Sequence, residues 1–398
     1  MEWNRREFIV KPIVVAGSAR VLGKTGSLVK DFLGDTAPLI QRTLGKTGLT
    51  LPVISMGVMN ADIPGLVRRS YELGMRHFDT AAVYQGGRNE EMVGTVIKEL
   101  GIRDKVIIST KQGFRSAPRS AADAKSHFMD GFEASLRRLQ MDHVDILYYH
   151  GVDDPEHARG EGVLEALQTL KKQGKTRFIG LSTHRATEVL PEAMRQNLFE
   201  VFLVTLNYTM VRDVEKLNTI ERAAKSGIGI VAMKTQAGGT VKPEPGLPNK
   251  LPPASQTALL KWVLNHDFIT TAIPGFSTYE HLEQDFSVAR NLAYTAEEKA
   301  FLADKSFAAQ AEFCQQCGKC SEDCPKQVDV CSLMRAHMYA VQYRNPELAR
   351  ETIAAIPSGR GLELCEGCES CKLACWNAVH IGKKIAQLRR IASSQFAC

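Results

Sequence analysis

The sequence predicts an α/β protein: a (β/α)8 TIM barrel followed by a small, mainly α-helical, cysteine-rich module. Two observations carry this prediction. From residue 51 onward, short apolar runs alternate with amphipathic segments of helical period, and this alternation repeats eight times. All ten cysteines of the 398-residue chain lie after residue 313. The chain is therefore divided between a long part without thiols and a short part rich in them.

The barrel prediction depends on eight apolar runs, each read as a strand. They cover residues 51–59, 76–80, 105–110, 144–150, 177–183, 201–208, 229–234 and 270–275. Helices are expected between them, among others over 65–74, 89–100, 124–140, 161–174 and 214–227. An open doubly wound sheet is the alternative. The barrel is favoured because the repeat reaches eight and no Gly-x-Gly-x-x-Gly opens the first helix.

Three segments are expected along the chain. Residues 1–40 form a leader and linker, 41–295 the barrel, and 296–398 a ferredoxin-like module entered through a charged helical bridge. The pentapeptide LGKTG occurs at 22–26 and again at 44–48. Neither copy has the glycine five residues upstream that a phosphate-binding loop needs, so both are expected to be loops or hairpin turns.

The first residues resemble a twin-arginine export signal. Arg5 and Arg6 are followed by Phe8 and a short apolar run, although Lys11 and Pro12 interrupt that run. The resemblance implies a bacterial protein of the periplasm or cell envelope. A disordered basic leader on a cytoplasmic protein is the alternative.

Net charge and hydropathy exclude two classes of partner. The formal net charge of +6 is spread thinly, without a run of lysine and arginine that would indicate nucleic acid. No apolar stretch approaches the ~20 residues of a transmembrane helix.

Four side chains able to move protons fall near the ends of the predicted strands. The strand ends give Asp79, Lys111 and His150, and Tyr84 follows shortly after the first. In such a barrel these ends meet at one mouth. A phenol ordinarily titrates near ~10, and a neighbouring ammonium is expected to lower its pKa. The four residues therefore predict a proton-transfer site in which Tyr84 is the general acid or base and His150 orients a carbonyl oxygen.

Several stretches of the sequence are similar to the aldo/keto reductase family across about residues 41–290. They are HFDTAAVYQGGRNEEMVG, IISTKQG, GFEASLRRLQMDHVDILYYHGVD and IPGFSTYEHLEQD. The resemblance implies an enzyme that interconverts a carbonyl and an alcohol, with hydride exchanged at a nicotinamide. The positions that match the family's catalytic tetrad are Asp79, Tyr84, Lys111 and His150.

The resemblance departs from the family's pattern at the nicotinamide contacts. The matching positions are Ser182, Thr183, Thr205, Met233, Gly275, Phe276, Ser277, His281 and Asp285. Met233 replaces an aromatic that stacks on the nicotinamide, His281 replaces the arginine that clamps the 2′-phosphate of NADP, and Asp285 replaces an asparagine. A histidine cannot make the bidentate phosphate contact of a guanidinium, and a carboxylate repels a phosphate. The fold implies NADP(H) or NAD(H), whereas these side chains argue against it.

The cysteines have the spacing of a two-cluster bacterial ferredoxin. The run C-x₂-C-x₂-C-x₃-C occurs at Cys314, Cys317, Cys320 and Cys324, and again at Cys365, Cys368, Cys371 and Cys375. In this motif the fourth cysteine of each run ligates the other cluster. We therefore expect one [4Fe–4S] cluster on Cys314, Cys317, Cys320 and Cys375, and a second on Cys365, Cys368, Cys371 and Cys324.

Zinc ribbons and disulfides are the competing interpretations. Zinc uses two C-x₂-C pairs and needs no third cysteine in a run, and two identical runs favour metal over disulfides. Cys331 and Cys398 are left over, and we expect a buried thiol and a frayed end. The module resembles the ferredoxin-like tail of one branch of the aldo/keto reductases.

These features together predict an oxidoreductase that acts on an aldehyde, ketone, sugar or alcohol. Electrons would pass between its two clusters and an electron-transfer protein partner. An NADPH-dependent cytoplasmic reductase with structural clusters is one alternative. A catalytically idle binding protein stapled by its clusters is another, because small cysteine-rich segments often need metal to fold.

Overall fold

A computed structural model describes residues 37–114, 118–237, 254–304, 313–366, 368 and 371–395. Residues Leu39–Cys398 form one compact unit, which includes both the barrel and the cysteine-rich module. The predicted leader lies almost wholly outside the described residues, as do the first LGKTG copy and Cys398. The expected boundary at residue 295 remains a prediction, because the chain on both sides of it belongs to the same unit.

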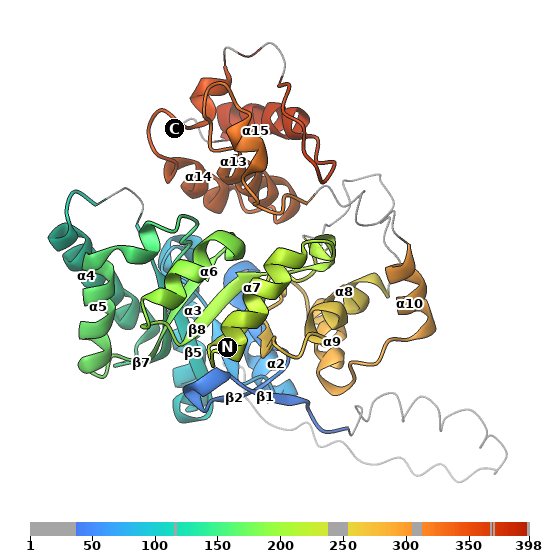
Figure 1. Ribbon diagram of the computed structural model, residues 1–398. Helices are drawn as coiled ribbons and strands as arrows, with labels where there is room; N and C mark the ends of the chain where they lie inside the picture. The colour runs from blue at the N-terminus through green and yellow to red at the C-terminus, as the bar shows by residue number, and fades with distance from the viewer. Residues whose placement is uncertain are drawn as a thin grey trace, which may run out of the picture. The chain divides into compact units, whose positions relative to one another are not determined.

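Eight parallel strands form a curled sheet, as predicted (Figure 1). They are β3 (Met56–Gly57), β4 (His77–Asp79), β5 (Ile107–Gln112), β6 (Val144–Tyr149), β7 (Thr176–Thr183), β8 (Val201–Thr205), β9 (Gly229–Met233) and β10 (Thr271–Ala272). Each strand pairs with the next in sequence. Bridges from Ile54 to Ala272 and from Gly57 to Gly275 join the two edges of the sheet. The sheet therefore closes on itself, which is the (β/α)8 arrangement.

Helices follow the strands and cover the outside of the sheet (Figure 1). They are α2 (Pro64–Leu73), α3 (Arg88–Leu100), α4 (Ala121–Leu139), α5 (Glu161–Lys172), α6 (Ala186–Arg195), α7 (Val214–Lys225), α8 (Ser255–Leu264), α9 (Tyr279–Ser287) and α10 (Ala296–Ala303). Side-chain caps fix several of their starts. Ser120 accepts a hydrogen bond from the Asp123 backbone N–H at the start of α4, and Thr295 forms a capping box with Glu298 at the start of α10.

The strand expected over residues 51–59 is divided in two. Its first part is β2 (Thr50–Pro52), which pairs with β1 (Gln41–Thr43) in an antiparallel hairpin. The backbone then changes partner, because the N–H of Val53 bonds to Ile40 but that of Ser55 bonds to Ala272 of β10. The second LGKTG copy is the turn of this hairpin, as expected. At Gly45 an added Cβ would lie 2.4 Å from the Gly229 nitrogen, so this turn needs glycine to approach β9.

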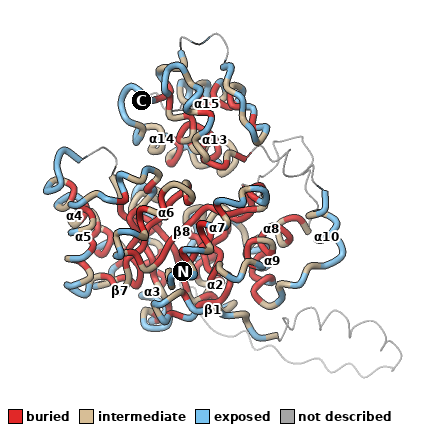
Figure 2. The backbone as a smooth tube through the Cα atoms, viewed as in Figure 1, coloured by how far each residue is buried: buried red, intermediate tan, exposed pale blue. Residues whose placement is uncertain are grey.

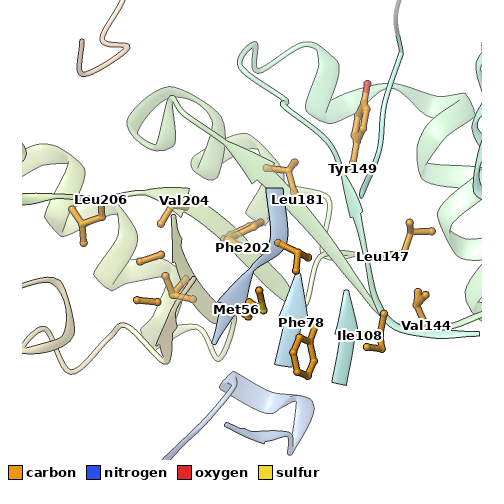
Figure 3. Close-up of a cluster of buried hydrophobic side chains, with 14 of the residues drawn as sticks. Met56, Phe78, Ile108, Val144, Leu147, Tyr149, Leu181, Phe202, Val204 and Leu206 are labelled. Carbon is orange, nitrogen blue, oxygen red and sulfur yellow. The ribbon is translucent and has the colours of Figure 1, made fainter. Parts of the chain in front are cut away.

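Apolar side chains cover both faces of the barrel strands: one set fills the interior of the barrel, and the other packs against the surrounding helices. Ile146 and Tyr148 of β6 point into the barrel, whereas Leu147 and Tyr149 contact the helix layer. Figure 3 shows part of the outer cluster, including Phe78, and Figure 2 shows that buried residues follow the strands and the inner faces of the helices. Both faces of a parallel barrel are covered, which explains why the strands read as nearly continuous apolar runs.

The cysteine-rich module is helical, in agreement with the prediction. Its elements are α12 (Lys319–Glu322), α13 (Val330–His337), the π-helical turn η8 (Met338–Gln342), α14 (Pro346–Ala354), η9 (Leu362–Cys365) and α15 (Ile381–Gln395). It has an apolar core of its own, which includes Val330 and Leu388. Met338, Tyr339 and Leu348 instead join the apolar cluster of the barrel. Within the described ranges, no helix has the length and apolar character needed to cross a membrane.

Candidate active site

A lysine, an aspartate and a tyrosine meet where β4 and β5 end. Asp79 is the last residue of β4, Lys111 lies one residue before the end of β5, and Tyr84 begins the short turn η3 (Tyr84–Gly87). The Lys111 Nζ atom donates a hydrogen bond to Asp79 and another, 3.3 Å long, to the Tyr84 hydroxyl. A third bond, 2.7 Å long, goes to the backbone oxygen of Thr80. The ammonium is thereby fixed between the carboxylate and the phenol.

The surrounding sequence supports this geometry. The second carboxylate oxygen of Asp79 accepts a 2.6 Å hydrogen bond from the Ser109 hydroxyl on the neighbouring strand. After Tyr84 the backbone turns through three residues with positive φ, namely Gln85, Gly86 and Gly87. Glycine adopts this conformation without steric cost, so the GG pair lets the loop turn sharply after the tyrosine and lead directly into α3.

Tyr84 is a protonated phenol at neutral pH. Burial raises the pKa of Tyr84 well above its ordinary value, and the charge of Asp79 acts in the same direction. This corrects the expectation that the neighbouring ammonium lowers it. The reason is that Lys111 is itself largely neutralised by Asp79, and burial lowers the pKa of Lys111. A neutral phenol can donate a proton, so the site as it stands is prepared for general acid catalysis.

His150 completes the set of four residues predicted to act together. It follows β6 directly, and its backbone N–H bonds to the Gln112 oxygen across 2.9 Å. Its ring meets that of Tyr84 edge-on, with the ring centroids 6.1 Å apart. Burial lowers the pKa of His150 well below its usual value, and the positive charge of Lys111 adds to this. The imidazole is therefore neutral and able to donate one hydrogen bond to a substrate oxygen.

An open pocket of about 650 Å³ lies beside this cluster. Its lining comprises Gly57, Met59, Asn60, Asp79, Tyr84, Leu203, Met233, Lys234, Thr235, Gln236, Ile273, Pro274, Gly275 and Tyr343. Most of these residues come from the ends of barrel strands, where the active sites of such folds lie. The pocket has room for a small carbonyl substrate beside Tyr84.

Of the positions matched to nicotinamide contacts, two line this pocket and a third, Thr205, is buried at the end of β8. Met233 and Gly275 line it. Thr205, at the end of β8, has a buried hydroxyl without a hydrogen-bond partner among the described residues, and so does Thr235 of the pocket wall. Buried hydroxyls are normally bonded, so these two are available to a polar group of a ligand.

At three further matched positions the side chain contacts other groups of the protein and not the pocket. The Ser182 hydroxyl accepts a 2.8 Å hydrogen bond from the Gly151 N–H, and the Thr183 hydroxyl donates to Asp153 across 3.3 Å. Phe276 is fully buried in the apolar core. None of the three lines the pocket.

The last three matched positions lie at or in α9. The Ser277 hydroxyl is 3.4 Å from the His281 ring nitrogen Nδ1. Asp285 is fully buried and accepts a 2.8 Å hydrogen bond from Gln236, and burial raises the pKa of Asp285 to about 7. A carboxyl with this pKa is partly protonated at neutral pH. Its repulsion of a phosphate is therefore weaker than the sequence argument assumed.

The structure also brings in residues that the sequence did not single out. Tyr343, from the cysteine-rich module, lines the same pocket as Tyr84. Lys234 follows β9 and donates a 3.1 Å hydrogen bond to the hydroxyl of Tyr339 in η8. No motif marks these side chains, because their place depends on how the module packs on the barrel.

The first group of cysteines lines a cavity in the module. Its cysteines are Cys314, Cys317, Cys320, Cys331 and Cys375. The first three come from one run and Cys375 from the other. Burial and three nearby thiols, those of Cys331, Cys317 and Cys375, raise the pKa of Cys320 to about 12.

The second group of cysteines combines three cysteines of the second run with the last cysteine of the first run. Burial raises the pKa of Cys365, and three neighbouring thiols raise it further. These are the thiols of Cys368, Cys324 and Cys371. Cys324 is the fourth cysteine of the first run, so the last cysteine of each run lies with the other run. This is the pairing that the ferredoxin spacing implies.

Cys331 and Trp376 both contact the first cysteine group, and Cys331 differs from expectation. Cys331 is half-buried rather than buried, and its thiol is hydrogen-bonded to that of Cys314. Trp376 stands where the first run has a proline, and its indole N–H donates to the Cys317 sulfur across 3.3 Å. N–H donors to cluster sulfurs are one means by which proteins set a reduction potential.

The structure does not show the metal site that the cysteine spacing predicts. Among the described residues, no group of three histidine, cysteine, aspartate or glutamate side chains is placed to hold a metal ion. The two iron–sulfur clusters therefore stay a prediction from the spacing of the cysteines.

Comparison with known proteins agrees with the fold. Residues 60–257 match the profile described as Aldo/keto reductase family. L-glyceraldehyde 3-phosphate reductase of Escherichia coli (strain K12) is 28% identical over 313 residues, covering 65% of this chain and 90% of the relative. L-galactose dehydrogenase of Arabidopsis thaliana is 28% identical over 292 residues, covering 63% and 88%.

A solved structure gives the same result for the fold. An aldo-keto reductase from Bacillus halodurans in its holo form superposes with a TM-score of 0.53 at 23% identity. The match covers 67% of this chain and 96% of that one. With its parallel barrel and its buried Asp–Lys–Tyr–His site, the chain is an oxidoreductase. Over residues 60–257 its barrel matches the aldo/keto reductase family.

Proposed function

We propose that the protein interconverts a carbonyl and an alcohol, with Tyr84 as the proton donor in the reductive direction. The observation that carries this proposal is the hydrogen-bonded chain from Asp79 through Lys111 to the Tyr84 hydroxyl, at the edge of an open pocket. The carbonyl oxygen of a substrate would accept hydrogen bonds from Tyr84 and from the neutral imidazole of His150. As negative charge develops on that oxygen, the phenol proton moves to it and Lys111 stabilises the phenolate that remains.

The substrate class we propose is a sugar-like aldehyde or ketone. The two relatives carry the names of a triose phosphate reductase and a galactose dehydrogenase, so both act on sugar-like compounds. The pocket lining supports the same class, because Asn60, Gln236 and Tyr343 offer hydrogen-bonding groups for hydroxyls.

A nicotinamide nucleotide is the hydride donor or acceptor that the family implies. When bound, it would supply or take up the hydride. In this chain Thr205 and Thr235 would hold its polar groups, and Met233 and Gly275 would contact its rings. The threonine hydroxyls, which have no hydrogen-bond partner among the described residues, support this assignment. The Ser182 hydroxyl is already bonded to the Gly151 N–H, so we expect the nucleotide to bind less tightly than the family's pattern implies.

Two [4Fe–4S] clusters are the groups we propose for the module. When bound, they would supply one-electron transfer to a redox partner protein. Cys314, Cys317, Cys320 and Cys375 would hold one, and Cys365, Cys368, Cys371 and Cys324 the other. Support comes from the exchange of the last cysteine between the two runs.

An assay with two electron sources tests the proposed activity. Purified anaerobically, the protein is offered a panel of aldehydes, ketones and aldoses with either NAD(P)H or a reduced viologen dye. Turnover with at least one carbonyl in either arm is expected. Turnover driven by viologen supports electron entry through the clusters, whereas turnover driven only by NADPH would favour structural clusters. No turnover in either arm over the whole panel would favour an idle binding protein.

We also propose export through the twin-arginine pathway, on the basis of Arg5, Arg6 and Phe8. This pathway moves proteins that are already folded around their cofactors, which suits iron–sulfur clusters. Replacing both arginines by lysine tests the proposal. Loss of the protein from the periplasmic fraction is expected, and unchanged fractionation would contradict export.

A further inference from the structure

The wall of the pocket that faces Tyr84 is built in part by the cysteine-rich module. Tyr343 lines the pocket, and Tyr339 lies beside it with the two ring centroids 5.8 Å apart. Both tyrosines contribute to the raised pKa of Tyr84, so both lie near the catalytic phenol. They belong to or directly follow a π-helical turn, an irregularity that is frequent at functional sites.

Lys234 connects this wall to the barrel. Its ammonium donates a 3.1 Å hydrogen bond to the Tyr339 hydroxyl. It also lies over both aromatic rings, 4.8 Å from the ring centroid of Tyr339 and 5.7 Å from that of Tyr343. The residue has a φ of 55°, which is unusual for a lysine and directs the backbone out of β9. The ammonium is thus held in a fixed place at the pocket.

Among the residues that the structure describes, no acid pairs with the charge of Lys234. The cations around it each have a carboxylate: Lys111 has Asp79, and Arg335 has Asp153 at 2.7 Å. Over the described ranges of the chain, no carboxylate forms an ion pair with Lys234, and the only hydrogen bond of its ammonium there goes to the Tyr339 hydroxyl. A half-buried ammonium that is fixed and lacks a counter-ion is a binding point for an anion.

We propose that Lys234, with Tyr339 and Tyr343, binds a phosphate or carboxylate group carried by the substrate. This inference rests on the proposed carbonyl chemistry and narrows its substrate to an anionic, sugar-like carbonyl compound. The carbonyl would lie at Tyr84 and His150, and the anionic end would lie at Lys234. Anchoring the far end of the substrate in this way orients the carbonyl for proton transfer.

A matched pair of substrates tests the proposal: glyceraldehyde 3-phosphate and glyceraldehyde. Lys234→Met is expected to lower the preference for the phosphorylated aldehyde, measured as the ratio of the two kcat/KM values, by about 10- to 100-fold, the effect of losing one charge-assisted contact. Lys234→Arg should keep most of the preference. Lys172→Met, at an exposed lysine of α5, is the control for charge alone. An unchanged ratio in Lys234→Met would overturn the proposal.

Calorimetric titration separates this inference from the proposed activity. Inorganic phosphate should bind the wild type and Tyr84→Phe equally, and should bind Lys234→Met at least about tenfold more weakly. This result holds even if no turnover is found, so the two proposals can fail independently. Titration with NADP(H) distinguishes the other source of phosphate. If Lys234→Met weakens nucleotide binding and leaves the substrate ratio intact, the assignment to the substrate is wrong.

Discussion

The Nζ atom of Lys111 lies 3.3 Å from the hydroxyl oxygen of Tyr84 and at the same time forms an ion pair with Asp79. Both the lysine and the aspartate are buried, with about 1% of each residue exposed. The ammonium therefore cannot move away from the phenol without leaving a carboxylate unpaired inside the protein. This arrangement ties the proton chemistry of Tyr84 to a charge pair that the barrel itself holds in place.

The pH dependence of the two reaction directions should follow from the raised pKa of Tyr84. Reduction needs the phenol, so its rate should show no loss attributable to Tyr84 from neutral pH up to about 10, the ordinary value for tyrosine. Oxidation needs the phenolate, so its rate should rise with pH over the same range. Rate profiles in both directions measure this. A reductive rate that falls with a midpoint near pH 7 would show that the phenol is more acidic than we infer.

The half-buried pair of Arg335 and Asp153 should stabilise the packing of the module on the barrel. The Arg335 and Asp153 side chains are 16% and 22% exposed, and the charges of His184 and Arg335 hold the pKa of Asp153 well below its usual range in spite of burial. Arg335→Met removes the guanidinium but leaves His184 and the Thr183 hydroxyl on the carboxylate, so it should lower the free energy of unfolding by about 1–3 kcal/mol. Urea unfolding measures the loss.

The double variant Asp153→Asn/Arg335→Met is the control for that experiment. It removes both charges and should be clearly more stable than Arg335→Met alone. Equal stability of the two variants would mean that the ion pair does not couple the residues. Because folding lowers the pKa of Asp153, the ion pair makes the stability of the protein depend on pH. Its stabilising contribution is present at pH values above the ordinary pKa range of carboxyl groups and is lost as the pH falls below that range.

Asp285 should have the opposite effect on the pH dependence of stability. Burial raises the pKa of Asp285 to about 7, so the folded protein keeps a proton that the unfolded chain releases near pH ~4. Its contribution to stability is therefore full at low pH and is lost as pH rises through 7. Relative to the wild type, Asp285→Asn should gain stability on the order of a few kcal/mol between pH 5 and pH 8. A constant difference between the two proteins over that range would refute the buried, proton-holding carboxyl.

Under the proposed assignment of two clusters, the exchange of cysteines between the two runs predicts which substitution removes which cluster. Cys375→Ser and Cys324→Ser should each disturb a different cluster and lower the iron content from about eight to about four atoms per chain. Cys331→Ser should keep about eight, because Cys331 belongs to neither set of ligands. Iron analysis and electron paramagnetic resonance of anaerobic samples measure this. Loss of iron in Cys331→Ser, with full iron content in Cys375→Ser, would show that Cys331 and not Cys375 is a ligand of the first cluster.

The barrel and its tetrad could be predicted from sequence because their signals are local. Apolar runs mark strands that are buried on both faces, and strand ends in a parallel barrel meet at one mouth, so Asp79, Lys111 and His150 follow from position alone. The division of residues 51–59 was missed because its cause is a change of hydrogen-bond partner, from β1 to β10, which no local pattern records. The spacing of the cysteines is itself a sequence property, and their role as cluster ligands stays a prediction.

What depends on packing was not predictable. The pKa of Tyr84 was expected to fall because the sequence brings an ammonium near, but burial outweighs that charge in the folded protein. At two matched positions the side chains are engaged inside the protein: the Ser182 hydroxyl accepts a hydrogen bond from a backbone N–H, and Phe276 is buried in the core. Tyr343 reaches the pocket from a segment some 260 residues after Tyr84, through the docking of one part of the chain on another.

Tyr84→Phe measures the central claim most directly, with Tyr149→Phe as the control. Tyr149 is also a buried tyrosine at a strand end, but its ring packs against Phe128 on the outside of the barrel. With the best carbonyl substrate, Tyr84→Phe should lower kcat by at least about 100-fold, the range for a general acid, while Tyr149→Phe should change it by no more than about threefold. If Tyr84→Phe turned over at the wild-type rate, the proton would come from elsewhere and our account of the active site would be wrong.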